Sequence, residues 1–238
     1  MGSVTLNRVH RFFVDPGAMA AERFPLPASI AHQVTRVLRL RDGDEITLLD
    51  GLGQEVRCRL DGGNCVVIER GEAAGEPAHQ LTIWQALLKG DHLEPVIRHA
   101  TELGIARFRL FVSERCVVRD LSPRKLERLQ AVAREAAEQS ERGIVPPVDA
   151  PVSYAQALKA AAPGSVLLFE RQNTKRLSQM EPPPGVFIGP EGGFSPAEME
   201  GAGWAGLAVA GLGPRILRSE TVAVAVAATI LSRTGDFA

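Results

Sequence analysis

From residue 80 onward, short apolar segments alternate with helical patterns, and this alternation constrains the fold more than any other feature of the sequence. The apolar segments are LTIWQALL (81–88), FRLFV (108–112), VLLFE (166–170), GVFIG (185–189) and LAVAGLG (207–213). Nearly continuous apolar runs of this length are typical of strands that are buried on both faces.

Helical patterns separate these predicted strands. They cover 91–103, 122 to about 142, 154–162, a segment that begins at SPAE (195–198), and the almost wholly apolar 221–232. Gly104 is expected to end the first helix, and Ser195 with Glu198 forms a capping-box pattern at the start of the fourth. Strands that alternate with helices predict an α/β domain with a mainly parallel sheet.

The residues before position 80 show a different pattern. Short β-branched or alternating segments lie at 11–14, 44–50, 54–60 and 64–70, and Gly/Asp turns separate the last three. A helical pattern covers 28–40, and 71–79 resembles a linker. We therefore expect a small antiparallel barrel at 1–74, followed by the α/β domain at 75–238.

Several classes of protein are disfavoured. No apolar run reaches the roughly 18–20 residues of a membrane span, and the first residues lack the apolar core of a signal peptide, so we expect a cytoplasmic protein without a membrane partner. The 3 cysteines lack CxxC spacing and the histidines lack HxxxH spacing, so no metal is expected. With a net charge of −1, any contact with nucleic acid must come from a local basic patch.

One familiar motif is misleading. Gly201, Gly203 and Gly206 match the GxGxxG pattern of dinucleotide-binding folds. That pattern binds a dinucleotide when a strand precedes the glycines and a helix follows them. Here a helix precedes them and a strand follows. We expect these glycines to form a helix end and a turn.

Two glycine-rich segments have the productive order of strand, turn and helix. They are IGPEGGFSPAE (188–198) and LGPRILRSET (212–221). Glycine lets ligand atoms touch the backbone, and ligands of open α/β sheets bind beyond the carboxyl ends of the strands. The two segments together predict one composite pocket.

These segments also carry a resemblance. They resemble the signature blocks of the 16S ribosomal RNA uridine-N3 methyltransferases of the SPOUT superfamily. Further similar stretches occur in family order, at RFFV (11–14), HQVTRVLRLRDGDEITLLDG (32–51), TELGI (101–105), SERC (113–116) and EAAEQSERGIVPPV (135–148). The resemblance covers essentially the whole chain.

The resemblance implies a PUA-like N-terminal barrel that binds RNA and a C-terminal α/β domain with a deep trefoil knot. It further implies methylation of N3 of a uridine in 16S rRNA, uridine 1498 in the usual numbering, by a homodimer that acts on rRNA or on the small ribosomal subunit. Two alternatives stay open: a SPOUT enzyme acting on another RNA site or on ribose 2′-oxygen, and a catalytically silent RNA-binding or ribosome-assembly factor.

The implied cofactor is S-adenosylmethionine, bound in the knot mostly by backbone groups. By resemblance its site comprises Leu168, Ile188, Gly189, Glu191, Gly192, Gly193, Leu212, Gly213, Ile216, Leu217 and Ser219.

The chemistry requires that the weakly acidic N3–H lose its proton or that cationic groups stabilise the developing anion. Arg218 stays protonated and is assigned to anion stabilisation or phosphate binding. Glu191, Glu138 and Glu220 are candidate bases, although capping of a loop or helix is the favoured role for each one taken singly.

Two groups of arginines are candidates for contact with RNA. The first lies in the barrel region and comprises Arg8, Arg11, Arg36, Arg39 and Arg41. Arg36 and Arg39 are expected to share a helix face. From the second group, between residues 107 and 142, we select Arg115 and Arg142. An aromatic content of 5% disfavours a base-stacking platform, so recognition is expected to rest on phosphate and shape.

Overall fold

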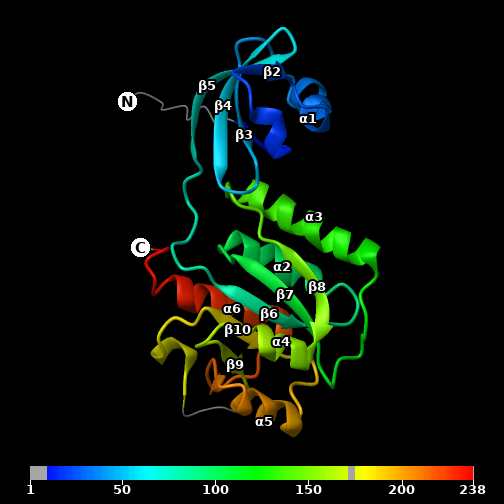
Figure 1. Cartoon of the computed structure of the whole chain (residues 1–238), viewed down its shortest axis with the longest axis vertical. Coiled ribbons are helices and arrows are strands. Elements are labelled where there is room, and N and C mark those ends of the chain that lie inside the picture. The colour runs from blue at the N-terminus through cyan, green and yellow to red at the C-terminus, as the bar shows by residue number, and fades with distance from the viewer. Residues whose placement is uncertain (1–9, 171–174, 238) are drawn as a thin grey trace. The chain divides into compact units, whose positions relative to one another are not determined.

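The computed structural model describes residues 10–170 and 175–237 (Figure 1). It divides into two compact units, which are described separately. The first combines the chain up to Glu76 with Glu138–Val145, and the second combines Pro77–Ala137 with the chain from Pro146 onward. Because Glu138–Val145 returns to the first unit, a single domain boundary in the sequence does not describe this division.

The first unit is built on a five-stranded sheet in the order β1-β3-β4-β5-β2. Its strands are β1 (His10–Phe13), β2 (Arg23–Pro25), β3 (Glu45–Leu49), β4 (Gln54–Asp61) and β5 (Asn64–Glu72). The predicted strands are present, and β2 is an additional one that is too short to produce a sequence pattern. Strands β3, β4, β5 and β2 pair antiparallel.

The expectation of a wholly antiparallel sheet was wrong at one edge, where β1 pairs with β3 in parallel. The physical reason is the connection, because a long crossover joins these two strands whereas a short hairpin would make them antiparallel. The crossover contains β2 and the short helices η1 (Pro16–Met19), α1 (Ala28–His32) and η2 (Gln33–Val37).

The helix predicted for 28–40 ends early. Helix α1 continues into η2, one turn of π-helix, and Leu40 N donates to the carbonyl of Val34 to close its end. Arg39 then adopts the left-handed conformation, with φ of 55°. Arg36 and Arg39 therefore do not share a helix face, which corrects the prediction.

Apolar side chains of the sheet and crossover form the core of the first unit: Phe12, Val14, Met19, Phe24, Ile30, Val34, Ile46, Leu48, Val56, Cys58, Leu60 and Cys65. The returning segment is fixed by Glu76. Its carboxylate accepts from Arg142 Nη2 at 2.7 Å and from the backbone N–H groups of Gly143 and Ile144 at 2.9 and 3.0 Å.

The second unit is an α/β domain on a six-stranded sheet in the order β11-β9-β10-β6-β7-β8, and every neighbouring pair is parallel. The strands are β6 (Thr82–Ala86), β7 (Arg107–Val112), β8 (Val148–Ser153), β9 (Val166–Leu168), β10 (Gly185–Ile188) and β11 (Ala208–Ala210). The predicted parallel sheet is confirmed. Strand β8 is additional, and its sequence VDAPVS lacks the apolar run of its neighbours.

The helices that alternate with these strands in the described residues are α2 (Leu93–Glu102), α3 (Pro123–Gln139), α4 (Tyr154–Ala160), α5 (Pro196–Trp204) and α6 (Ser219–Leu231) (Figure 1), with the short η3 (Leu177–Gln179) before β10. Helix α2 packs against α6, and α4 packs against α5. Gly201 and Gly203 lie inside α5, and Gly206 turns toward β11 with φ of 78°, as expected for a helix end rather than a dinucleotide loop.

The strand order brings particular loops together. Strands β11, β9, β10 and β6 are neighbours, so the loops that follow their carboxyl ends meet at one edge of the sheet. Within the described residues, no helix has the length and apolar character that crossing a membrane requires.

Candidate active site

A cavity of about 530 Å³ lies where these loops meet. Its walls are Lys89 and His92 after β6, residues 168–170 after β9, residues 188–194 after β10, and residues 212–222 after β11, apart from Pro214 and Thr221. The cavity therefore occupies the position at which open α/β sheets bind their ligands.

Every residue predicted for the cofactor lines this cavity: Leu168, Ile188, Gly189, Glu191, Gly192, Gly193, Leu212, Gly213, Ile216, Leu217 and Ser219. The two glycine-rich segments thus form one pocket, as expected. Sequence reasoning missed other lining residues: Lys89, His92, Phe169, Glu170, Pro190, Phe194, Arg215 and Val222. For Lys89 and His92 the available signal was their position directly after a predicted strand.

Glycine is required at specific points of the first loop. Gly193 has φ of 67°, where a side chain is strained, and it closes a turn in which its N–H donates to the carbonyl of Pro190 at 2.9 Å. A Cβ added at Gly189 would lie 3.1 Å from Cε2 of Phe194, which is tighter than ordinary contact. The bare backbone therefore keeps the loop in its present path.

A buried hydrogen-bonded chain connects the two glycine-rich segments. Ser219 Oγ donates to the carbonyl of Gly189 at 2.8 Å and accepts from Gln85 Nε2 at 3.1 Å. Gln85 is fully buried, and Ser219 is 8% exposed. These contacts fix the start of α6 against the ends of β6 and β10.

The far end of the first loop is held by the capping box of α5. Ser195 and Glu198 cap each other as predicted. The buried Glu198 carboxylate also accepts from Ser113 Oγ at 3.0 Å and from Glu114 N at 2.9 Å. Arg115 Nη1 donates to the carbonyl of Gly192 at 3.0 Å. The segment after β7 thus supports the loop, and Arg115, selected for RNA, contacts it directly.

The candidate catalytic residues are divided by the structure. Arg218, Glu191 and Glu220 line the cavity, and the Arg218 side chain is 84% exposed. Glu191 Oε1 accepts from the backbone N–H of Lys89 at 3.2 Å. Glu138 does not line the cavity: it belongs to the first unit, where its Oε1 accepts from Phe13 N at 3.5 Å. Glu138 therefore belongs to a different unit from the other three candidates.

The predicted RNA-contacting arginines also separate. Arg36, Arg39 and Arg41 are exposed, and their side chains form no ion pair with another described residue. Arg11 is half-buried and paired with Glu55 at 2.9 Å. Arg8 lies outside the described residues.

The prediction that Arg142 contacts RNA is corrected by its burial. Its side chain is 4% exposed and paired with Glu76 at 2.7 Å. A guanidinium enclosed in this way fixes the returning segment of the first unit and presents no charge to a phosphate.

Two protein-family models match this chain, one in each part of the sequence. The model of the RNA methyltransferase domain matches residues 75–231, and that of the RNA methyltransferase PUA domain matches residues 26–69. The chain is 35% identical over 233 residues to ribosomal RNA small subunit methyltransferase E of Synechocystis sp., with 93% of this chain and 77% of the relative covered. It is 31% identical to the protein of that name from Bacillus subtilis, with 90% and 92% covered.

A solved structure agrees with these relatives. Ribosomal RNA small subunit methyltransferase E from Neisseria gonorrhoeae, solved bound to S-adenosyl methionine, superimposes with a TM-score of 0.84 at 30% identity. The match covers 94% of this chain and 98% of that one.

Proposed function

This chain belongs to the RNA methyltransferase family, and we propose that it methylates N3 of one uridine in 16S ribosomal RNA, uridine 1498 in the usual numbering. The predicted family and fold class, a SPOUT-type α/β domain with a mainly parallel sheet and a small PUA-like domain, are confirmed. The protein is an S-adenosylmethionine-dependent rRNA methyltransferase.

The observation that carries the proposal is the shared cavity of the two glycine-rich segments. Its volume of about 530 Å³ suits a small organic cofactor, since such sites measure roughly 300–1,000 Å³. Its walls combine apolar side chains such as Leu168, Ile188 and Leu217 with glycine backbone at Gly189 and Gly193. We assign the predicted cofactor residues to this role. When bound, the cofactor supplies an electrophilic methyl group on a sulfonium.

The polar residues of the cavity fit a uracil imide. Arg218 presents an exposed guanidinium at the site, and a cation there stabilises the negative charge that develops on uracil when N3–H is lost. Glu191 and Glu220 are the predicted carboxylates that line the same cavity. We therefore keep Arg218 as the anion-stabilising residue, and Glu191 and Glu220 as members of the site.

For RNA binding we assign residues 1–74 to the role of a PUA-like domain and residues 75–238 to methyl transfer. Among the described residues, Arg36, Arg39 and Arg41 are the candidates that offer unpaired positive charge, and charge of this kind is what binding to phosphate requires. The partner is 16S rRNA or the small ribosomal subunit, which places the enzyme in the cytoplasm.

The active form is a homodimer in this proposal. Helix α6 is apolar over almost its whole surface, yet the chain buries one face of it, at Ala223, Val226, Ala227, Ile230 and Leu231. Val222, Val224 and Ala225 are only half-buried. A two-fold copy of the same helix is the simplest cover for such a face.

Mass mapping of rRNA tests the target. Small-subunit rRNA from cells that lack this protein should lose a single methyl group at one uridine, and the purified protein with S-adenosylmethionine should restore it at N3. Methylation restored at a ribose 2′-oxygen would contradict the proposed reaction. Calorimetry with S-adenosylmethionine separates an enzyme from a silent RNA-binding factor, because the latter would show no binding.

A further inference from the structure

His92 occupies an unusual position in the cavity. It is the N-cap residue of α2, yet its side chain makes no capping hydrogen bond. Its Nδ1 is buried and has no hydrogen-bond partner among the described residues, although the side chain as a whole is 41% exposed. The ring is therefore partly accessible even though Nδ1 is buried, and His92 lines the cavity.

The buried nitrogen faces a carboxylate. Glu220 Oε2 lies 3.9 Å from His92 Nδ1, and Glu220 Oε1 lies 4.0 Å from Arg218 Nη1. Glu220 is in the first turn of α6, where the helix dipole favours a negative charge. A carboxylate beside Nδ1 favours the tautomer with the proton on that nitrogen, which leaves the lone pair of Nε2 free to accept a proton.

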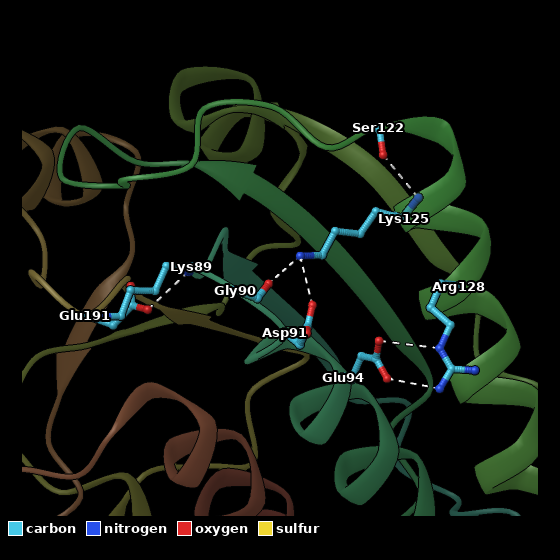
Figure 2. Close-up of polar contacts among 8 residues, drawn as sticks. All are labelled: Lys89, Gly90, Asp91, Glu94, Ser122, Lys125, Arg128 and Glu191. Atoms are coloured by element: carbon cyan, nitrogen blue, oxygen red, sulfur yellow. Dashed lines mark hydrogen bonds and ion pairs between the residues drawn. The ribbon is translucent and has the colours of Figure 1, made fainter.

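The loop that presents His92 is held from several sides (Figure 2). Lys125 on α3 contacts the carbonyl of Gly90 and the carboxylate of Asp91, and Ser122 Oγ accepts from the N–H of Lys125 at 3.3 Å. Glu191 accepts from the N–H of Lys89 on the other side of the loop. The segment that directly precedes His92 is thus anchored.

A second anchor lies within the first turn of α2. Arg128 on α3 donates to both carboxylate oxygens of Glu94, at 3.4 and 3.2 Å (Figure 2). Since Glu94 is two residues beyond His92, this pair restrains the helix start that carries the imidazole.

We propose that His92 accepts the proton of the uracil N3–H and that Glu220 positions it, a proposal that rests on the function proposed above. The uracil N3 loses its proton to His92 Nε2. The electron pair of N3 forms a bond to the methyl carbon, and the carbon–sulfur bond of the sulfonium breaks with its electrons left on sulfur. The products are N3-methyluridine, a neutral thioether and an imidazolium beside Glu220, so charge and atoms balance.

Besides His92, the charged residues that line the cavity are Lys89, Glu170, Glu191, Arg215, Arg218 and Glu220.

Reaction rates measured across a pH series test the role of His92 directly. With small-subunit rRNA as substrate, His92→Gln should lower the single-turnover rate at pH 7.5 by about 100-fold or more. The variant's rate should then rise about tenfold per pH unit, because hydroxide has to replace the missing base. The parent's rate should instead stop rising as the pH increases.

Two further variants serve as controls for His92→Gln. His99→Gln changes an exposed histidine of the same helix and should retain the parent rate and pH profile. Glu220→Gln should lower the rate by about tenfold, since the imidazole remains but loses its orienting carboxylate. A His92→Gln rate within threefold of the parent, with the same pH profile, would overturn the proposal.

A measurement without RNA covers the case in which a variant does not fold. Nitrogen-15 NMR of the parent at pH 8 should show His92 with the proton on Nδ1 and a free Nε2, and Glu220→Gln should reduce that preference. The opposite tautomer in the parent overturns the proposal. Failure of the proposed function looks different, because the parent itself would then form no N3-methyluridine.

Discussion

Ser219 Oγ donates a hydrogen bond of 2.8 Å to the carbonyl of Gly189, which joins the first turn of α6 to the end of β10. Gly189 belongs to the first glycine-rich segment and Ser219 to the second, so this hydrogen bond joins the two segments that form the cavity. The same hydroxyl accepts from the buried Gln85 Nε2, so its removal takes one hydrogen bond from each of these two groups.

Ser219→Ala should lower the free energy of unfolding by about 1–3 kcal/mol and weaken S-adenosylmethionine binding, because the Gly189 carbonyl and the buried Gln85 amide each lose a hydrogen bond. Thermal denaturation and calorimetry measure the two effects. Ser232→Ala, at the exposed end of the same helix, should change stability by no more than about 0.5 kcal/mol. Equal effects of the two substitutions would contradict the role of the Ser219 hydroxyl.

Gly193→Val should reduce S-adenosylmethionine affinity at least about tenfold while the protein still folds, because a β-branched residue is strained at φ of 67° and displaces the loop. Calorimetry reports the affinity and circular dichroism the fold. Gly203→Ala is the control, since Gly203 lies inside α5 and a Cβ added there would meet no other atom within 4 Å. Unchanged affinity in folded Gly193→Val would refute the assignment of this loop to the cofactor.

Replacing both Arg36 and Arg39 by alanine should weaken rRNA binding and reduce its salt slope by about two units, roughly one for each phosphate that is no longer neutralised. Affinity for S-adenosylmethionine should not change. Arg23→Ala removes an arginine of the same unit that is already paired with Asp61 at 2.6 Å, and it should have a smaller effect. If the double variant binds rRNA like the parent across a salt series, these arginines do not bind the RNA.

Glu76→Ala should destabilise the first unit by about 3–5 kcal/mol, because it breaks the buried pair with Arg142 and removes the acceptor of two backbone N–H groups. Denaturant titration measures the destabilisation. Glu69→Ala, which removes an exposed partner of Arg57, should cost at most about 1 kcal/mol. Destabilisation of similar size in both variants would show that the Glu76–Arg142 pair does not fix the returning segment.

Light scattering at micromolar concentration should give a mass of twice 25.6 kDa for the active protein. Val224→Glu on the half-buried face of α6 should shift it toward the single-chain mass, because a charge would enter the dimer interface. Val117→Glu, at an exposed valine elsewhere, should not. An active species of 25.6 kDa in the parent would refute the dimer.

The sequence by itself determined the features that depend on neighbouring residues. The apolar runs of β6, β7, β9 and β10, and the capping box at Ser195, are local patterns that specify their own conformation. The glycines of the two loops are equally local, since their conformational freedom is a property of the residue. For this reason every residue predicted to bind the cofactor lines the cavity.

Only the tertiary structure decided which charged side chains share that cavity. Glu138 and Arg142 looked equivalent to the other candidates in sequence, but they belong to the first unit, where Arg142 pairs with Glu76. Glu220 is far from His92 in the sequence and lies beside it only because α6 packs against α2. Partners of this kind lie far apart along the chain, and the energy of a charge depends on what surrounds it in space, so no local pattern encodes them.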